Sequence, residues 1–431
     1  MRSPDAGAAD PCAAFVGPEV EVCATFPTAC ELVFRDGRGC DAACAVAGLV
    51  CAASYEDVSG ACAPDRARPA LGCGDTGHGS DYCVCVDPAG CTPSCDGREC
   101  GSDGCGGTCG GCADDEACRA GACESAIRPH EVLVSEVVGF GRHTTGGLGG
   151  PVCWVDSLDD AGSGTLRDCA EGGGPRWIRF RVSGEIRLRS PLDVASDKTI
   201  DGRGQRIEIT GRGVRLDGVR NVILHNLIFR DGAGDDGEDA IRIVDGTENV
   251  WIDHVTLSDY PDGLIDITRA SRMVTVSWCE LFDHDKVMLI SHSPEHTPDE
   301  AIRVTLHHNH FHDTTQRHPR LRFGRVHTFN NLHRRWDSYA IGASHRSQLV
   351  SEHNVFVAGS DPDAIETRVG SDPDHAECVR SDGDRFRNGA RRRERDPDEC
   401  FVPDYPYTLD PVGDVESIVR AGAGWQDVVA P

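Results

Sequence analysis

The sequence predicts an all-β chain, a parallel β-helix (solenoid) preceded by small disulfide-rich modules. Two observations indicate this: short β-rich segments recur along the C-terminal part of the chain, and cysteine is concentrated before them. Of the 23 cysteines, 18 fall between Cys12 and Cys123, and the 308 residues that follow hold five. A cysteine-dense N-terminal region therefore precedes a conventional globular domain.

The N-terminal cysteines form two groups of even size, ten in residues 1–90 and eight in residues 91–126. Even counts permit five and four disulfides, although connectivity cannot be deduced from sequence. Disulfides persist outside a reducing cytosol, so we expect a secreted protein, even though the opening residues MRSPDAGAAD lack the apolar core of a signal peptide. The C-x2-C spacing of Cys109 and Cys112 also suits zinc, but the crowding of cysteines favours disulfides. Surface attachment and carbohydrate adhesion are both open as roles for these modules.

The formal net charge is −27, from 70 acidic and 43 basic residues. Such an acidic chain is not expected to bind nucleic acid or an anionic membrane surface. No stretch approaches the roughly 18 apolar residues of a transmembrane helix. We therefore expect no membrane span, no nucleic-acid partner and a monomer.

Six segments of residues 127–431 look alike, each a β-branched or aromatic run that ends on Asn, His or Cys. They are NVILHN (221–226), VWIDH (250–254), TVSWC (275–279), TLHHN (305–309), HTFNN (327–331) and VSEHN (350–354). Their last residues are 28, 25, 30, 22 and 23 positions apart. One strand every 22 to 30 residues suits one coil of a parallel β-helix, in which loops of different lengths leave one face.

Stacked coils place equivalent residues above one another, which predicts an interior ladder of amide side chains. Its expected members are Asn226, Asn309, Asn331 and Asn354, interrupted by His254 and Cys279. At this position Cys279 is expected to be a buried and inert thiol. We expect the other four cysteines of this domain to pair as Cys153 with Cys169 and Cys378 with Cys400.

Carboxylates are concentrated in two stretches of this repeat, DDGEDAIRI (235–243) and DGLID (262–266). Hard oxygen ligands of this kind select Ca²⁺, which tolerates irregular geometry. The alternative is that β-turns simply favour Asp and Gly.

Cations gather nearby in sequence, with Lys286 in DHDKVML (283–289) and four arginines in QRHPRLRFGR (316–325). Alone, these residues would be solvated or paired with surface acids. In-register coils would bring Lys286, Arg317 and Arg322 to the face that carries the aspartates, which predicts a site for a polycarboxylate.

The histidine-rich stretch HHNHFHD (307–313) also suggests a metal site. However, His307 and His308 should alternate across a strand and so cannot easily converge on one ion. Structural roles are favoured for this stretch.

Several of these motifs resemble, in order and spacing, the signature segments of pectate lyases of polysaccharide lyase family one. They are VWIDH, DGLID, VTVSWCELFDHDKVMLIS and RHPRLRFGRVHTFNN. The resemblance runs from GFGRHTTGGLGG (139–150) to YPYTLDP near the C-terminus and leaves the cysteine-rich region outside. It implies a right-handed parallel β-helix and calcium-dependent eliminative cleavage of polygalacturonate, which gives 4,5-unsaturated oligogalacturonates.

The resemblance also implies a set of site residues. They are Asp239, Asp262 and Asp266 as calcium ligands, Lys286 and Arg322 as substrate-binding residues, and Arg317 as the general base. One departure is that some members carry an additional aspartate where this chain has Gly237. Asp236 or Glu238 would have to replace it, so the number of protein ligands is open.

An arginine base is unusual, because a free guanidinium stays protonated. Neighbouring cations would disfavour its charged form, and the expected consequence is an alkaline activity optimum. Two alternatives are kept: a pectin lyase that acts on methyl-esterified pectin, and a non-catalytic β-helical adhesin for acidic polysaccharide. The three aspartates speak against the first, because an esterified substrate offers no carboxylate for calcium to bridge, and a base speaks against the second.

Overall fold

The computed structural model describes residues 11–17, 19–26, 28–35, 37–57, 62–64, 71, 73, 80–87, 95, 99, 109–110, 116–119, 122–125, 130–367, 377–393 and 400–427. The chain separates into two compact units, with the division between residues 127 and 128.

The first unit contains a four-stranded antiparallel sheet in the order β1-β2-β4-β3 and one short helix. The elements are β1 (Val20–Phe26), β2 (Ala29–Phe34), α1 (Cys40–Ala45), β3 (Val50–Glu56) and β4 (Asp81–Val86). All ten cysteines of residues 1–90 are paired, as Cys12–Cys30, Cys23–Cys62, Cys40–Cys83, Cys44–Cys85 and Cys51–Cys73. The prediction of five disulfides in this region is confirmed.

The spacing of two of these pairs follows from local geometry. Residues four apart share one face of a helix, and residues two apart share one face of a strand. Cys40 and Cys44 on α1 therefore meet Cys83 and Cys85 on β4, with a Cα–Cα distance of 5.3 Å in each pair.

The second cysteine group contains an antiparallel hairpin of β5 (Glu116–Arg119) and β6 (Ala122–Ser125). Cys109 is bonded to Cys95. The zinc alternative for Cys109 and Cys112 is therefore wrong, because a disulfide sulfur is not available as a thiolate ligand. Cys112 itself lies outside the described residues, and the boundary near residue 90 stays a prediction.

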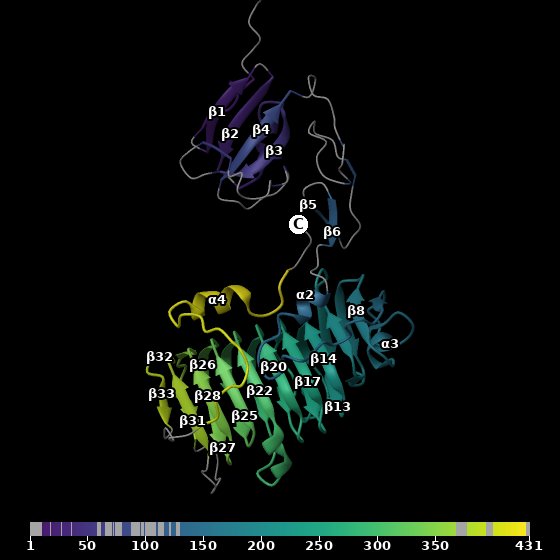
Figure 1. Cartoon of the computed structure of the whole chain (residues 1–431), viewed down its shortest axis with the longest axis vertical. Coiled ribbons are helices and arrows are strands. Elements are labelled where there is room, and N and C mark those ends of the chain that lie inside the picture. Colours follow the sequence, from purple (N-terminus) through teal and green to yellow (C-terminus); the bar gives the residue numbers. More distant parts are fainter. Residues whose placement is uncertain are drawn as a thin grey trace, which may run out of the picture. The chain divides into compact units, whose positions relative to one another are not determined.

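The second unit is a parallel β-helix with three strands in each full coil, which confirms the predicted fold. One strand of each coil joins a ten-stranded sheet, and the other two form two rows of a seventeen-stranded sheet. The ten-stranded sheet contains β7 (Val152–Val155), β8 (Arg176–Phe180), β11 (Lys198–Asp201), β14 (Arg220–His225), β17 (Glu248–Asp253), β20 (Arg272–Ser277), β22 (Arg303–His307), β25 (Arg325–Phe329), β28 (Gln348–Glu352) and β31 (Cys378–Asp382). Figure 1 shows its strands following one another from β8 to β31.

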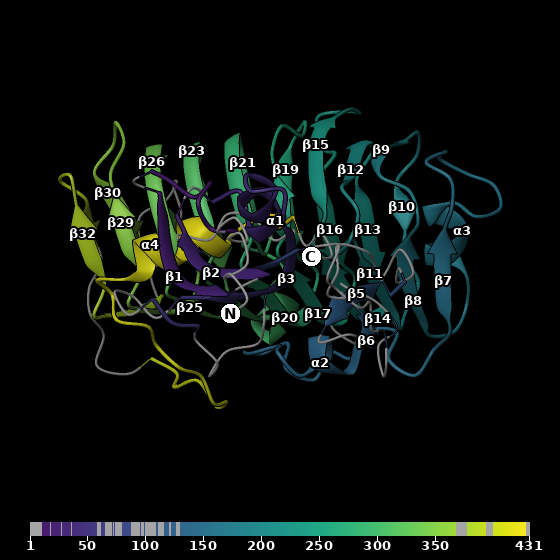
Figure 2. The ribbon, with the colours of Figure 1, turned by 90° about the horizontal axis from the view of Figure 1, so that it is seen from above.

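The first row of the larger sheet follows the ten-stranded sheet in each coil. It contains β9 (Gly184–Leu188), β12 (Ile207–Gly211), β15 (Ile228–Gly232), β18 (Thr256–Leu257), the first part of β21 (Glu280–Ile290), β23 (His310–Gln316), β26 (Leu332–Tyr339), β29 (Val355–Val357) and β32 (Arg385–Arg387). Figure 2 shows many of these strands side by side along the solenoid.

The second row completes each coil. It contains β10 (Leu192–Asp193), β13 (Val214–Asp217), β16 (Ile241–Val244), β19 (Gly263–Ile267), the last part of β21, β24 (Arg320–Arg322), β27 (Ile341–Ser344), β30 (Asp363–Glu366) and β33 (Arg391–Arg393).

The six segments recognised in the sequence are β14, β17, β20, β22, β25 and β28, which are successive neighbours in the ten-stranded sheet. Their apolar residues stack in columns inside the coil. In one such column Leu224, Ile252, Val276 and Leu306 occupy matching register positions and are fully buried. The repeat is therefore the pattern of a shared core, in which each coil buries its apolar face against its neighbours.

The interior amide ladder forms, but with one member fewer than predicted. Asn309 Nδ2 donates to Asn331 Oδ1, and Asn331 Nδ2 donates to Asn354 Oδ1, each over 2.9 Å. Asn226 does not take part, because it exchanges hydrogen bonds with the backbone of Gln426. Asn226 has φ +56°, and His254 has φ +51°, so both occupy the left-handed turn position one residue before the interior column.

The outer face of the ten-stranded sheet is covered by chain segments from before and after the coils. The backbone N–H groups of Phe140 and Gly141 donate to the hydroxyls of Thr305 and Thr275, each over 3.0 Å. Gly139, with φ +102°, allows this close approach, since a Cβ there would lie 2.5 Å from the Thr305 side chain. The glycine-rich stretch near residue 140 is thus explained by its contact with the sheet.

Three helices and one 3₁₀ turn accompany the coils in the described part of this unit: α2 (His130–Val134), α3 (Leu166–Glu171), the turn Thr297–Ala301 and α4 (Val415–Gly422). α4 lies against the solenoid, where its Val415 and Val419 pack on Leu332 of β26 and Val355 of β29. Within the described residues, none of the helices is both long enough and apolar enough to cross a membrane.

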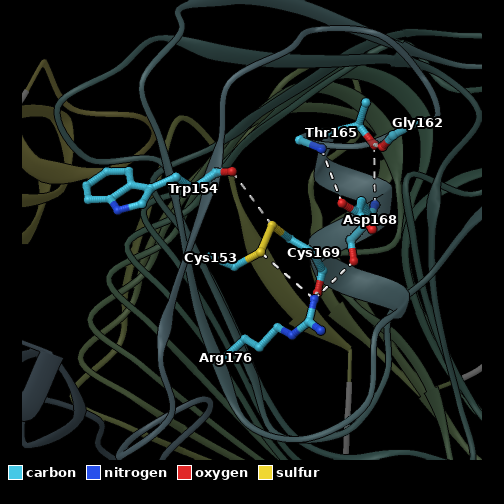
Figure 3. Close-up of a disulfide and its surroundings, with 8 residues drawn as sticks. Cys153, Trp154, Gly162, Thr165, Asp168, Cys169 and Arg176 are labelled. Atoms are coloured by element: carbon cyan, nitrogen blue, oxygen red, sulfur yellow. Dashed lines mark hydrogen bonds between the residues drawn. A yellow bond between two sulfur atoms is a disulfide. The ribbon is translucent and has the colours of Figure 1, made fainter.

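Both disulfides predicted for the second unit are present, Cys153–Cys169 and Cys378–Cys400. Figure 3 shows the first, which joins β7 to α3. Arg176 donates from Nη1 to the backbone oxygens of Asp168 and Cys169, over 3.1 and 3.3 Å. Cys279 is free and fully buried, and burial raises the pKa of its thiol, as expected of an inert cysteine.

Candidate active site

The predicted carboxylates come together on the second row of the large sheet. Asp239 lies in the connection between β15 and β16, Asp262 directly precedes β19, and Asp266 lies within β19. β19 pairs in parallel with β21, with Gly263 opposite Lys286. The fold therefore places Lys286 on the coil next to the aspartates.

Gly263 is the point at which two of these carboxylates approach each other. Its N–H donates to Asp239 Oδ1 over 2.9 Å. A Cβ at Gly263 would lie 2.7 Å from Asp239 Oδ1 and 3.1 Å from Asp266 Oδ1. Only glycine fits between them without displacing a carboxylate.

The burial and crowding of these carboxylates raise the pKa of two of them. Burial, followed by the charge of Asp262, raises the pKa of Asp239 to about 6. Burial, followed by the charges of Asp239 and Asp262, raises the pKa of Asp266 well above its usual value. Buried and mutually repelling oxygen donors fit a hard cation such as Ca²⁺.

Among the described residues, Lys286 is the cation that forms an ion pair with one of these aspartates. Its Nζ lies 2.7 Å from Asp262 Oδ1, and both side chains are partly exposed, at 36% and 30%. His284, two residues earlier on β21, lies with Nε2 2.9 Å from the Asp262 backbone oxygen. The Asp262 loop is thus held by β21 while its carboxylate faces solvent.

Arg317 lies between β23 and β24 in a left-handed conformation, with φ +70°. Its backbone oxygen accepts a hydrogen bond from Met288 N over 2.9 Å, and its side chain hydrogen-bonds Tyr339. Its Nε is buried without a hydrogen-bond partner among the described residues. Arg317 is also one of the charges that act on Asp266, so the predicted base and a predicted calcium ligand belong to one site.

The other arginines of this stretch have separate environments. Arg322 donates from Nη1 to Ser291 O over 3.2 Å, and burial, followed by the charge of Arg317, lowers its pKa. Arg320, whose orientation the sequence leaves open, is buried, and burial followed by the charge of Arg322 lowers its pKa to about 10. Arg325 is exposed and lies over the Phe401 ring, a peripheral place as expected.

One cation of the site was missed by sequence reasoning. Arg242 of β16 occupies the register position next to Asp266, and Arg215 of β13 occupies the position beyond it. Arg242 and Arg215 line a pocket of about 200 Å³ that also includes Asp239. The exposed Arg242 makes no ion pair with another described side chain, whereas Arg215 is paired with Asp193 at 2.5 Å.

Glu238 does not supply the additional carboxylate that is absent at Gly237. Glu238 Oε2 forms an ion pair with Arg212 at 2.8 Å, and Glu238 Oε1 accepts from Gly213 N over 2.8 Å. Both carboxylate oxygens are thus already engaged. Asp236 is exposed and its role stays open.

His307 and His308 have structural roles, as predicted, although they do not diverge. Their Nδ1 atoms lie 3.0 Å apart, because the left-handed conformation of His308 (φ +56°) breaks the alternation of the strand. His307 stacks on Phe329, and His308 Nε2 lies 2.9 Å from Asp410 Oδ2. His307 therefore packs within the coils, and His308 helps to attach the C-terminal segment to them.

Comparison with known proteins agrees with this geometry. A family model described as pectate lyase matches residues 184–373. A pectate lyase of Lilium longiflorum is 39% identical over 290 residues, which cover 60% of this chain and 66% of that protein. Pectate lyase 1 of Chamaecyparis obtusa is also 39% identical over 290 residues, covering 60% of this chain and 76% of that protein. The chain thus spans slightly less than two thirds of the lily protein.

Solved structures show the same fold. The crystal structure of jun a 1, the major allergen from cedar pollen, matches with a TM-score of 0.63 at 33% identity, covering 68% of this chain and 94% of that one. A pectate lyase from Bacillus sp. N165 in complex with trigalacturonate matches with a TM-score of 0.54 at 25% identity, covering 67% and 98%.

Proposed function

Because the chain belongs to the pectate lyase family, we propose that it cleaves polygalacturonate by calcium-dependent β-elimination. The observation that carries the proposal is the meeting of Asp239, Asp266 and Arg317 in one site. A polymer of carboxylates requires positive charge for binding, and elimination requires a base at the sugar ring. Both requirements match residues that share this site.

Asp239, Asp262 and Asp266 would hold Ca²⁺ through their oxygens. When bound, the ion withdraws charge from the substrate carboxylate, which acidifies the proton at C5. The raised pKa values of Asp239 and Asp266 support this assignment, because burial and then the charges of neighbouring carboxylates disfavour their ionised forms, and a bound cation would offset both effects.

Lys286 and Arg322 bind the substrate in this proposal. Their positive charges would face the negative charge that develops as the C5 proton leaves, and fixed charges of this kind stabilise the transition state. Arg322 is suited to this role because Ser291 O and its partly buried surroundings limit its movement. Arg242 extends the cationic surface along the solenoid and would contact a neighbouring sugar unit.

Arg317 takes the proton from C5. The electron pair of that C–H bond forms the C4=C5 double bond, the C4–O bond breaks, and the leaving oxygen takes up a proton. A guanidine can act as a base only when its charged form is disfavoured, and crowded cations provide that condition. An alkaline activity optimum is expected, because a guanidinium gives up its proton more readily at higher pH. Maximal activity at pH 5 with calcium present would contradict this role.

The test is the ultraviolet absorbance of the unsaturated product, followed on polygalacturonate and on highly methylated pectin, with and without chelator. We expect activity on polygalacturonate that chelator abolishes and added Ca²⁺ restores. Chelator-resistant activity that prefers methylated pectin would identify a pectin lyase instead. No product from either polymer, with binding to polygalacturonate retained, would identify an adhesin.

We also propose that the protein acts outside the cell, as a monomer. The disulfides of both units support an oxidising compartment. Reduction under native conditions should destabilise the first unit most, because its small core is built largely from bonded cysteines.

A further inference from the structure

A second group of ligating side chains lies on the first row of the large sheet, at the starts of β21 and β23. Glu280, His310 and His312 offer one ligand atom each, and these atoms all lie within 4.8 Å of one another. The proposed elimination uses none of them.

Strand geometry explains why the three side chains converge. His310 and His312 are two residues apart on β23 and therefore point to the same face of the sheet. Glu280 is the register partner of His310 on the preceding coil. Glu280 Oε1 lies 3.1 Å from His312 Nε2 and 3.8 Å from His310 Nδ1.

His312 is oriented by a second carboxylate. Its Nδ1 lies 2.7 Å from Asp313 Oδ2, and Asp313 is in turn held by Arg335. An imidazole that donates from Nδ1 to a carboxylate keeps its Nε2 lone pair free for a metal, which is the usual arrangement around metal-bound histidine. Here that Nε2 lies 3.1 Å from Glu280 Oε1, so both atoms could be ligands of one ion.

His310 lacks partners that a buried imidazole normally has. Its residue is 8% exposed, and its Nε2 is buried without a hydrogen-bond partner among the described residues. Its Nδ1 faces Glu280 Oε1 at a distance too long for a hydrogen bond. No hydrogen bond to a described residue therefore holds the Nδ1 atom that faces Glu280, and this atom is available as a ligand.

We propose that Glu280, His310 and His312 bind a first-row transition metal ion, with Zn²⁺ as the preferred ion. Two imidazole nitrogens and one carboxylate oxygen suit zinc and leave a fourth position for water. Ca²⁺ would be a poor occupant, because it takes oxygen ligands. The side chains of Glu280 and His312 are 33% and 15% exposed, so an ion can enter from solvent.

Three arginines lie near the group, and one of them, Arg334, is the register partner of His312 on β26. Arg335 is neutralised by Asp313, and Arg420 of α4 is paired with Glu416 at 3.2 Å. The C-terminal segment also passes close by, since a Cβ on Gly424 would lie 3.1 Å from Glu280 Oε2. A bound ion would therefore fasten β21 to β23 directly beside this segment.

Two other groups of the described residues show similar convergence. In the group of Asp41, Cys51 and Cys73, the two cysteines form a disulfide. In the group of His225, Asp253 and His254, the aspartate bonds both rings as well as Ser277. The sulfurs of the first group are therefore unavailable, and the carboxylate of the second group already has three side-chain partners, although His225 Nδ1 makes no well-aligned hydrogen bond.

The test is zinc titration of the chelator-dialysed full chain by calorimetry, with Ca²⁺ in excess to occupy the aspartates. We expect one equivalent of zinc that His312→Ala and Glu280→Gln each lose. Asp313→Asn should retain the stoichiometry and weaken binding about 10- to 100-fold, as removal of an outer carboxylate does. The matched control is His292→Ala, an exposed histidine near His296 but outside the group, which should bind zinc as the wild type does.

Cobalt provides a second measurement on the same variants. Co²⁺ at the site should give the visible bands of a low-symmetry nitrogen and oxygen environment, and His312→Ala should lose them. Thermal unfolding in chelator identifies variants that remain folded, and only these are compared. Equal zinc uptake by the wild type, His312→Ala and Glu280→Gln would overturn the proposal, as would loss of the equivalent in His292→Ala. Because the readout is metal binding, the result does not depend on lyase activity.

Discussion

Two of the outer faces of the solenoid, that of the ten-stranded sheet and that of the second row of the larger sheet, hold buried charges differently. On the face of the ten-stranded sheet, which chain segments cover, buried carboxylates are paired. Arg203 bonds Asp201 through two nitrogens, over 2.9 and 2.7 Å, and His327 lies 2.9 Å from Glu352. Burial acts to raise the pKa of Asp201, but the charge of Arg203 overcomes it and lowers that pKa to about 2.

On the open face of the second row, like charges are neighbours. Asp239 and Asp266 share the space beside Gly263 and have raised pKa values, and Arg320 and Arg322 have lowered ones. The covered face thus pairs the buried Asp201 with an arginine, whereas Asp239 and Asp266 on the open face form no ion pair with another described residue. Perturbed groups of the second kind are typical of functional sites.

The largest expected effect lies on the open face. Arg317→Lys retains the positive charge but changes the base, so we expect kcat on polygalacturonate to fall about a thousandfold at saturating calcium. The initial rate of ultraviolet absorbance increase measures it. Arg325→Lys is the matched control and should keep the wild-type rate. A folded Arg317→Lys protein that cleaves at that rate would remove Arg317 from the proposed chemistry.

On the covered face the effect should be on stability. Arg203→Ala leaves the buried Asp201 without its partner, and we expect the free energy of unfolding to fall by about 3–5 kcal/mol at pH 7. The exposed Arg187, 3.9 Å from Glu185, is the control, and its alanine variant should lose less than about 1 kcal/mol. Urea unfolding of both variants provides the measurement.

The pH dependence of this loss follows from the lowered pKa of Asp201. A carboxyl whose pKa is lower in the folded state stabilises the fold above its unfolded value, 3.8, and this contribution is lost as the pH falls through about 2. The deficit of Arg203→Ala should therefore be full above pH 4 and shrink below it. A deficit that is constant from pH 7 to pH 2 would show that the pair is not its cause.

In the presence of chelator, Asp239→Asn should raise the free energy of unfolding, because it removes one negative charge from a cluster of mutually repelling carboxylates. The raised pKa means that Asp239 stabilises the fold below 3.8 and loses this contribution as the pH rises through about 6. We expect the variant to exceed the wild type by on the order of 1 kcal/mol above pH 6. In contrast, Ca²⁺ should raise the Tm of the wild type more than that of the variant. Lower stability than the wild type at pH 8 in chelator would contradict the repulsion.

The smallest expected effect concerns Arg242, which is exposed. Arg242→Ser should raise the KM for polygalacturonate about two- to fivefold and leave kcat unchanged, because one solvated charge contributes little. Added salt should reduce the difference between variant and wild type. An unchanged KM at low salt would place the polymer elsewhere on the open face.

Local sequence patterns were sufficient for the repeat, the three disulfide predictions and the inert thiol Cys279. The amide ladder shows the limit of such patterns. Asn226 ends a segment just as Asn309 does, yet it lies one position earlier in the coil, and a slip of one residue moves a side chain from the interior to the turn. Only the backbone conformation, with φ +56° at Asn226, separates the two cases.

The residues of the candidate sites also fall into two groups, those predicted from local motifs and those that only the fold brings together. Asp239, Asp262, Asp266, Lys286, Arg317 and Arg322 were predicted from motifs, and the fold brings the three aspartates and Lys286 close together. Arg242 and Glu280 were not recognised, and structural roles were favoured for the stretch that contains His310 and His312, because the neighbours of these residues come from different coils. Glu280 and His310 are 30 residues apart, whereas Arg242 and Asp266 are 24 apart, so no fixed spacing identifies both pairs.

By itself, then, the sequence determined the β-helix and the chemical types available to it, because strand runs, turn residues and cysteine spacing act over a few residues. Only the tertiary structure decided which charges are paired and which face each other unpaired. The physical reason is that contact between coils depends on register, and register is set by loops of different lengths. Asp201 and Asp239 are both buried, but the charge of Arg203 lowers the pKa of the first to about 2, whereas burial and the charge of Asp262 raise the pKa of the second to about 6.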